Sequence, residues 1–269
     1  MKRPTIFVVG LSLLSVVALS ACDGSAPLSS GSTNAAGSQS NGTAQSIPGF
    51  AVRANWPPSP AKGEEVLLVE NLLANNYYFI ADFSGSMREN ACNSREPKAD
   101  VAKRVLSEVA AEVPVGANLG LLVFNSDHGV KELVPLGVGQ EHRRAFKGAV
   151  GALRADGGTP LSTAIKAGYE KLMIQARRQR GYGEYHLVVV TDGEANFGYD
   201  PTDAVNEIIA TSPVVVDVAG FCIGLKHSLN QVGRTNYREA SSPESLREAL
   251  LAAVLAESPV FDVKAFVQQ

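Results

Sequence analysis

Five oxygen-bearing side chains stand where apolar or helical segments begin or end in this 269-residue sequence. Asp82, Ser84 and Ser86 follow a run of Tyr, Phe and Ile, and Asp192 comes shortly after a second apolar run. Thr159 stands between them, just before a helical pattern. Hard divalent cations prefer oxygen ligands, and Mg²⁺ takes them in near-octahedral geometry. These residue types and their spacing therefore predict a Mg²⁺ (or Mn²⁺) site.

The segments that would position these side chains alternate between two patterns. Four runs are apolar on both faces, which predicts buried strands of a parallel sheet. They are residues 77–81, 119–124, 185–190 and 214–223. Residues 100–113 and 141–153 instead have an apolar stripe typical of helices, and residues 130–136 predict an edge strand. The alternation predicts an α/β fold with a doubly wound, mostly parallel central sheet flanked by helices.

Three more helices are predicted where a polar residue precedes proline, which is favoured in the first helical turn. The pairs are Thr159-Pro160, Asp200-Pro201 and Ser242-Pro243. Doubly wound sheets bind ligands outside the carboxyl ends of their strands, where the strand order reverses. We therefore expect the five oxygen-bearing residues to converge there, on solvent-facing loops whose replacement leaves no cavity in the core.

Three short motifs occur in order along the chain. Residues 82–86 are D-F-S-G-S, residues 157–161 are G-G-T-P-L and residues 191–194 are T-D-G-E. Together they resemble the three loops of the metal-ion-dependent adhesion site of von Willebrand factor type A domains. The resemblance covers residues 75–257 and includes a last helix over 242–257, which shifts on ligand binding in related domains.

The resemblance also implies a role for each metal-site residue. Ser84 and Ser86 would bind the ion directly through their hydroxyls. Thr159 would bind directly or through water, and Asp82 and Asp192 would act mainly through waters. Because only two carboxylates face the ion, it keeps an open coordination position. The resemblance therefore implies a protein-binding module that recognises an exposed Asp or Glu of a partner protein.

Two other functions remain open at this stage. The metal could serve only to stabilise a structural module. A hydrolase is the second alternative, but the sequence around Ser84 lacks the G-x-S-x-G pattern of a nucleophile elbow. A D-x-D phosphatase would need an acid at position 84, and the four histidines lack zinc-like spacing. We therefore expect a binding protein rather than an enzyme.

Residues 1–21 have the features of a signal peptide, since two basic residues precede an apolar run too short to span a membrane. Leu-Ser-Ala-Cys at 19–22 resembles the bacterial lipobox, in which Cys22 is lipidated and becomes the first residue of the mature chain. The alternative is an ordinary signal peptide cut before Cys22. We expect lipid anchoring to a cell membrane, with the domain facing the periplasm or the cell exterior. Asp23 resembles an inner-membrane retention signal.

The remaining segments and the composition complete the predicted organisation. Residues 22–60 are rich in Ser, Gly and Asn and then in Pro, which predicts a flexible tether, and residues 258–269 predict a strand-like extension. With 45% hydrophobic and 19% charged residues, the chain has the composition of a folded protein. A formal net charge of −3 argues against a surface for nucleic acid.

Two cysteines remain once Cys22 is acylated, and export would place them in an oxidising compartment. Cys92 follows the first predicted strand, and Cys222 lies near the carboxyl end of the fifth. Both are expected on the metal side of the sheet, so we predict a disulfide between them. The alternative is a buried, apolar Cys222 with a free thiol at Cys92.

Overall fold

The computed structural model describes residues 55–125 and 128–255 of the chain. They form a six-stranded sheet with the order β3-β2-β1-β4-β5-β6. The strands are β1 (Asn76–Asp82), β2 (Asn118–Asn125), β3 (Gly129–Gly137), β4 (Tyr185–Thr191), β5 (Val215–Phe221) and β6 (Asn236–Ala240). Every neighbouring pair is parallel except β2 with β3, which is antiparallel. The predicted doubly wound, mostly parallel sheet is therefore confirmed.

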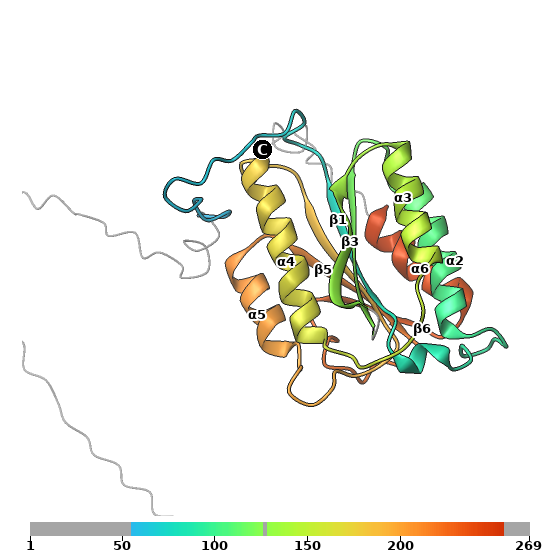
Figure 1. The fold of residues 1–269 in the computed structure, drawn as a ribbon. Helices are drawn as coiled ribbons and strands as arrows, with labels where there is room; N and C mark the ends of the chain where they lie inside the picture. Colours follow the sequence, from blue (N-terminus) through green and yellow to red (C-terminus); the bar gives the residue numbers. More distant parts are fainter. Residues whose placement is uncertain (1–54, 126–127, 256–269) are drawn as a thin grey trace, which may run out of the picture. The chain divides into compact units, whose positions relative to one another are not determined.

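Helices cover both faces of this sheet (Figure 1). On one face lie α2 (Lys98–Glu112), α3 (Gln140–Gly151) and α6 (Pro243–Val254), and on the other α4 (Leu161–Arg178) and α5 (Thr202–Thr211). Side chains of β1 alternate between the two cores, so that Tyr77 and Phe79 pack on the first and Tyr78 and Ile80 on the second. Burial on both faces explains why this strand is apolar along most of its length.

The strand order reverses between β1 and β4. From β1 the chain continues outward to β2 and β3, and it then returns to place β4 on the other side of β1. The two strands pair in parallel, with Ala81 opposite Val190. Their carboxyl ends therefore lie side by side, at the position where doubly wound sheets bind ligands.

Three details differ from the sequence-based expectation. Strand β6 was not predicted, because Asn236–Ala240 is half polar and only Ala240 is buried. Helix α6 ends at Val254, within the predicted 242–257. Of the three predicted caps, Ser242 accepts a hydrogen bond from Ser245 N at 3.2 Å, and Asp200 Oδ1 accepts one from Thr202 N, the first residue of α5, at 2.8 Å. Thr159 does not cap its helix. Pro160, not Thr159, flanks the start of α4.

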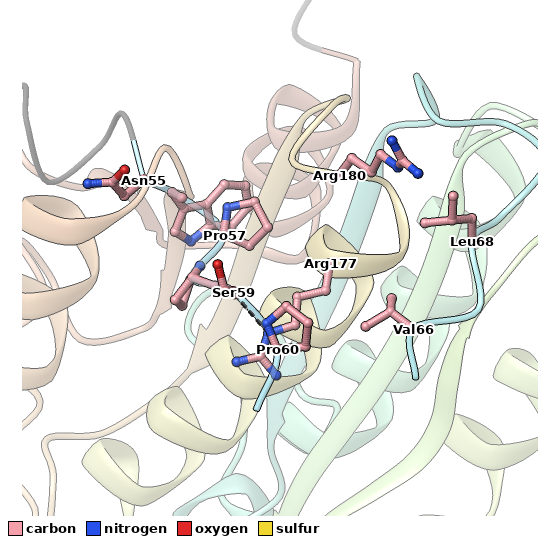
Figure 2. A pocket seen from close by; sticks show the side chains of 10 residues that line it. Asn55, Pro57, Ser59, Pro60, Val66, Leu68, Arg177 and Arg180 are labelled. Atoms are coloured by element: carbon pink, nitrogen blue, oxygen red, sulfur yellow. Dashed lines mark hydrogen bonds between the residues drawn. The ribbon is translucent and has the colours of Figure 1, made fainter. Parts of the chain in front are cut away.

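The predicted signal peptide, Cys22, most of the tether and the extension at 258–269 lie outside the described residues. Residues 55–60 of the predicted tether pack against the domain at the amino end of β4. Trp56 contacts Tyr185 edge to face, with ring centroids 4.8 Å apart. Arg177 Nε donates a hydrogen bond to Pro58 O at 3.2 Å, beside a hollow of ≈ 730 Å³ (Figure 2).

None of the helices within residues 55–125 and 128–255 combines the length and the apolar character that crossing a membrane requires.

Candidate metal and ligand site

Asp82 is the last residue of β1 and is only 1% exposed. Its Oδ1 accepts a hydrogen bond from Ser84 N at 2.8 Å, and its Oδ2 accepts one from Thr191 Oγ1 at 2.7 Å. Burial, together with the negative charge of Asp192, raises the pKa of Asp82 to about 6. The site therefore holds a carboxylate whose charge is only partly compensated by its hydrogen bonds.

A second carboxylate, Asp192, follows β4, and its side chain has no exposed surface. Its Oδ1 accepts a hydrogen bond from Ser86 Oγ at 2.7 Å, and its Oδ2 accepts one from Lys98 Nζ at 2.9 Å. The hydroxyl oxygens of Ser84 and Ser86 lie 3.1 Å apart. Oxygens from the first and third predicted metal loops are thus in direct contact.

The loop of Thr159 is attached to both of the others. Gly85 N donates to Gly157 O at 2.9 Å, which ties this loop to the one after β1. Asn196 N donates to Thr159 O at 3.1 Å, and Thr159 N donates in return to the Asn196 side chain. The structure therefore joins Asp82, Ser84, Ser86 and Asp192 in one chain of contacts through Thr191 and the serines, and it holds the Thr159 loop against them.

The expectation that these residues sit on solvent-facing loops is wrong. Asp82, Ser84, Thr159 and Asp192 are between 1% and 6% exposed, and only Ser86 is partly accessible. The three loops fold against one another, and their polar groups satisfy each other instead of water. Replacing one of the buried carboxylates therefore affects stability as well as ligand binding.

Sequence reasoning missed Lys98, which contacts Asp192 and also Glu89 Oε2 at 3.1 Å. The position of this lysine could have indicated that it has an acidic partner. Lys98 is the first residue of α2, where the positive end of the helix dipole disfavours a cation. Asn196 was missed as well, and no pattern in the sequence marks it.

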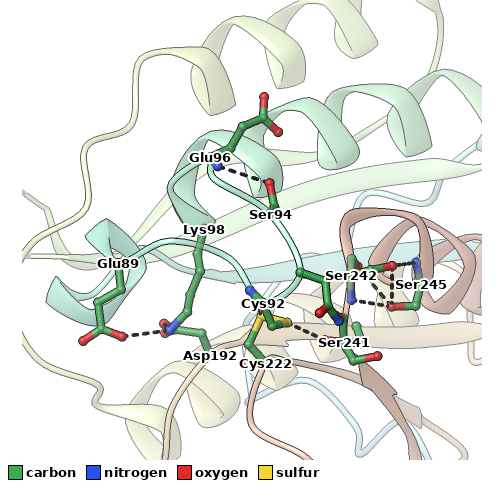
Figure 3. Close-up of a disulfide and its surroundings, with 12 residues drawn as sticks. Glu89, Cys92, Ser94, Glu96, Lys98, Asp192, Cys222, Ser241, Ser242 and Ser245 are labelled. Atoms are coloured by element: carbon green, nitrogen blue, oxygen red, sulfur yellow. Dashed lines mark hydrogen bonds and ion pairs between the residues drawn. A yellow bond between two sulfur atoms is a disulfide. The ribbon is translucent and has the colours of Figure 1, made fainter.

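A disulfide joins Cys92 to Cys222, with Cα atoms 5.6 Å apart (Figure 3). It attaches the loop after the short 3-10 helix η1 (Gly85–Arg88) to the segment after β5. Asn93 Nδ2 also donates to Ser241 O at 2.9 Å, immediately before α6. The continuation of the first predicted metal loop is therefore held to the start of α6.

The donor set fits a hard cation. Ligands at neighbouring corners of an octahedral Mg²⁺ site lie about 3 Å apart when the metal–oxygen bonds are about 2.1 Å. The distance between Ser84 Oγ and Ser86 Oγ, the two expected direct ligands, is 3.1 Å and close to this spacing. The described part of the chain contains no group of three or more His, Cys, Asp or Glu that could hold a metal. Hydroxyl groups would have to complete the coordination.

Comparison with known families decides the classification. The model of the von Willebrand factor type A domain matches residues 76–253. The chain belongs to this family. A search of curated proteins found no match.

Solved structures share the fold of this type A domain at low sequence identity. The pilus adhesin SpaC from Lactobacillus rhamnosus GG has a TM-score of 0.53 and 16% identity over 71% of this chain and 31% of its own. BatB from Bacteroides thetaiotaomicron has a TM-score of 0.54 and 17% identity over 68% of this chain and 98% of its own. Proximal thread matrix protein 1 of the mussel byssus gives 0.52 and 20%, over 68% and 47%. The match thus spans under half of SpaC and of the byssus protein.

Proposed function

We propose that this type A domain is a divalent-metal-dependent protein-binding module, anchored to a membrane through lipid on Cys22. Ser84, Ser86 and Thr159 would hold Mg²⁺ (or Mn²⁺), with Asp82 and Asp192 beside them. The observation that carries the proposal is the cluster of buried oxygens from three loops, at the point where the strand order reverses.

The side chains around this cluster prepare it for a cation. Asp192 Oδ1 accepts a hydrogen bond from the Ser86 hydroxyl, so that a lone pair of the serine oxygen stays available for a metal. Asp82 Oδ1 accepts a hydrogen bond from the Ser84 amide and thereby fixes the backbone between Asp82 and Ser84. When bound, the ion supplies a positive charge with room for one carboxylate from a partner protein. Two proteins of similar fold are described as a pilus adhesin and a byssus matrix protein, which supports a binding role.

Contacts of the serine hydroxyls favour binding over hydrolysis. Ser84 Oγ faces Ser86 Oγ, and within the described residues no histidine nitrogen bonds to either hydroxyl. His227 Nε2, on the neighbouring segment, instead contacts Gly193 O at 3.1 Å. The base within reach of Ser86 is Asp192, whose other oxygen is held by Lys98. We propose that this carboxylate orients a metal ligand and that the domain is not an enzyme.

Capture of a partner from native membranes tests the proposal. The purified protein should retain a partner in Mg²⁺ and release it in EDTA, and Asp192→Ala should retain none. Retention that is unaffected by EDTA, with only the melting temperature lowered, would show that the ion merely stabilises the fold. Calorimetry that detects no saturable binding at millimolar Mg²⁺ or Mn²⁺ would overturn metal dependence altogether.

The membrane anchor has its own test. Cys22→Ser should move the protein from the membrane fraction to the soluble extract, because the acylated thiol is lost. Cys92 belongs to the disulfide and is left intact, so folding of the domain is unaffected. An unchanged distribution of the Cys22→Ser variant would rule out lipidation.

A further inference from the structure

Lys98 places an ammonium group beside the proposed metal site (Figure 3). Its Nζ lies 2.9 Å from Asp192 Oδ2 and 3.1 Å from Glu89 Oε2. The side chains of Lys98 and Asp192 are 9% and 0% exposed, whereas that of Glu89 is 71% exposed. Water screens the contact with Glu89, so the dominant interaction of the ammonium is with the buried Asp192 carboxylate.

The backbone around Lys98 holds this ammonium in place. Lys98 N donates to Glu89 O at 2.8 Å, and Asn90 and Pro97 form an isolated β-bridge that closes the loop between them. The disulfide from Cys92 ties the same loop to the segment after β5. Lys98 is therefore part of the folded site and not a surface lysine that samples many rotamers.

The two oxygens of Asp192 have different partners. Oδ1 contacts the Ser86 hydroxyl on the side of the predicted metal ligands, and Oδ2 contacts Lys98. A divalent ion and the ammonium can therefore act on this carboxylate at the same time, each through its own oxygen. Neither has to leave for the other to bind.

Counting the buried charges shows what Lys98 changes. Asp82 and Asp192 alone would neutralise a divalent ion, whereas with Lys98 the ion-loaded site keeps one positive charge. Burial lowers the pKa of Lys98, but its hydrogen bonds and charge interactions with Asp192 and Glu89 outweigh this and raise the pKa above its ordinary value. Lys98 is thus a cation at neutral pH.

We propose that Lys98 is a built-in counter-ion of Asp192, which stabilises the metal-free site and weakens the binding of a divalent ion to it. The inference rests on the proposed function, because it concerns the same metal site. If Lys98 only positioned or packed its neighbours, its loss would destabilise the metal-free protein and also weaken metal binding. A counter-ion role predicts opposite effects: a less stable metal-free protein and tighter metal binding.

Lys98→Met tests this with the full-length protein in detergent at pH 8. In EDTA its melting temperature should fall, because Asp192 Oδ2 loses its buried partner. Its affinity for Mg²⁺ alone, measured by calorimetry, should rise about tenfold, since a positive charge in contact with Asp192 is removed from the site. Lys98→Arg keeps the charge and should bind Mg²⁺ like the wild type. Lys103→Met on the same helix removes a more exposed lysine paired with Asp100 and should change neither measurement.

The outcomes separate this inference from the proposed function. Equal Mg²⁺ affinity of the wild type and Lys98→Met, or tighter binding by Lys98→Arg as well, would overturn the role of Lys98 alone. Binding by Lys98→Met but not by the wild type would support that role and overturn metal dependence of the native protein. Absence of binding in both would overturn both. If Lys98→Met fails to fold, Lys98→Gln replaces it, since its amide can still donate to Asp192 without a charge.

Discussion

Strand β1 begins and ends on a buried polar residue, and its two ends have opposite character. At the amino end, Asn76 Nδ2 donates to Ala74 O and Glu184 O, both at 2.9 Å, and its Oδ1 accepts from Asn118 Nδ2 at 2.9 Å. At the carboxyl end, Asp82 is equally buried but carries a charge and has Asp192 as a neighbour. A closed network of neutral amides needs no ligand, whereas two buried carboxylates favour a cation.

Other amides extend the neutral network at the amino end. Gln179 is fully buried, donates to Leu72 O and Ala74 O, and accepts from Gln175 Nε2 at 3.0 Å. These bonds hold the chain that leads into β1 against the end of α4. The two ends show that buried polar groups alone do not indicate a ligand site. A buried charge that the surrounding protein compensates only in part is the better indicator.

Introducing a charge at the neutral end should have the largest effect. Asn76→Asp would place carboxylate oxygens against Ala74 O and Glu184 O, which now accept hydrogen bonds from the amide. We expect the free energy of unfolding to fall by about 3 kcal/mol or more at pH 8, measured by urea denaturation. Mg²⁺ affinity of the folded fraction should not change. A loss below about 1 kcal/mol would show that the amino end of β1 tolerates a charge. The proposed difference between the two ends would then be wrong.

Removing a carboxylate at the charged end should act mainly on the metal. Asp82→Ala should weaken Mg²⁺ binding by about 10–100-fold in calorimetry, because the residue supports the ion and orients the first loop. Asn118→Ala, at the opposite edge of the sheet, is the matched control. It should destabilise the fold, since Asn76 Oδ1 loses its donor, and leave Mg²⁺ affinity unchanged. Equal affinities of the two variants would contradict the assignment of the site.

The pH dependence of stability, compared between the wild type and Asp82→Asn, tests the charge at this end of β1. The pKa of Asp82 is raised from 3.8 to about 6, so the folded state favours the protonated form. The charge therefore costs no stability below about pH 4, and the cost grows until the pH exceeds about 6. In EDTA, we expect the wild type to lose about 2–3 kcal/mol relative to Asp82→Asn between pH 4 and 7. Parallel stability curves of the two proteins would contradict this. Saturating Mg²⁺ should reverse the difference at pH 7.

Thr159→Ala should have the smallest effect on stability. Its position before proline predicted a helix cap, but the side chain does not cap α4. We expect a change within about 0.5 kcal/mol, together with weaker Mg²⁺ binding. Ser242→Ala is the reciprocal control, because Ser242 caps α6 in a capping box. That variant should lose about 1 kcal/mol and keep its metal affinity. A larger loss for Thr159→Ala would indicate a structural role for the hydroxyl.

Much of the fold could be predicted from local patterns, and the failures have physical causes. The central strands were predicted because burial between two helical layers demands apolar residues on both faces. Strand β6 was missed because it lies at the edge of the sheet and is half polar. It pairs with β5 through its backbone, which requires no apolar pattern. The three loops of the candidate metal site were recognised from their motifs, but the burial of Asp82 was not expected, since motif spacing does not report how tightly loops fold together.

Local patterns in the sequence predicted the alternation of strands and helices, and they pointed to five oxygen-bearing residues at one edge of the sheet. Both depend on local periodicity and short motifs, which each segment carries independently of its partners. The pairing of Cys92 with Cys222 differs, because counting the cysteines of an exported chain already predicted it. The contact of Lys98 with Asp192, 94 positions away, became visible only in the folded structure. Such a contact depends on which distant group the folded backbone brings next to a buried charge. No local pattern in either segment predicts that the two residues will meet.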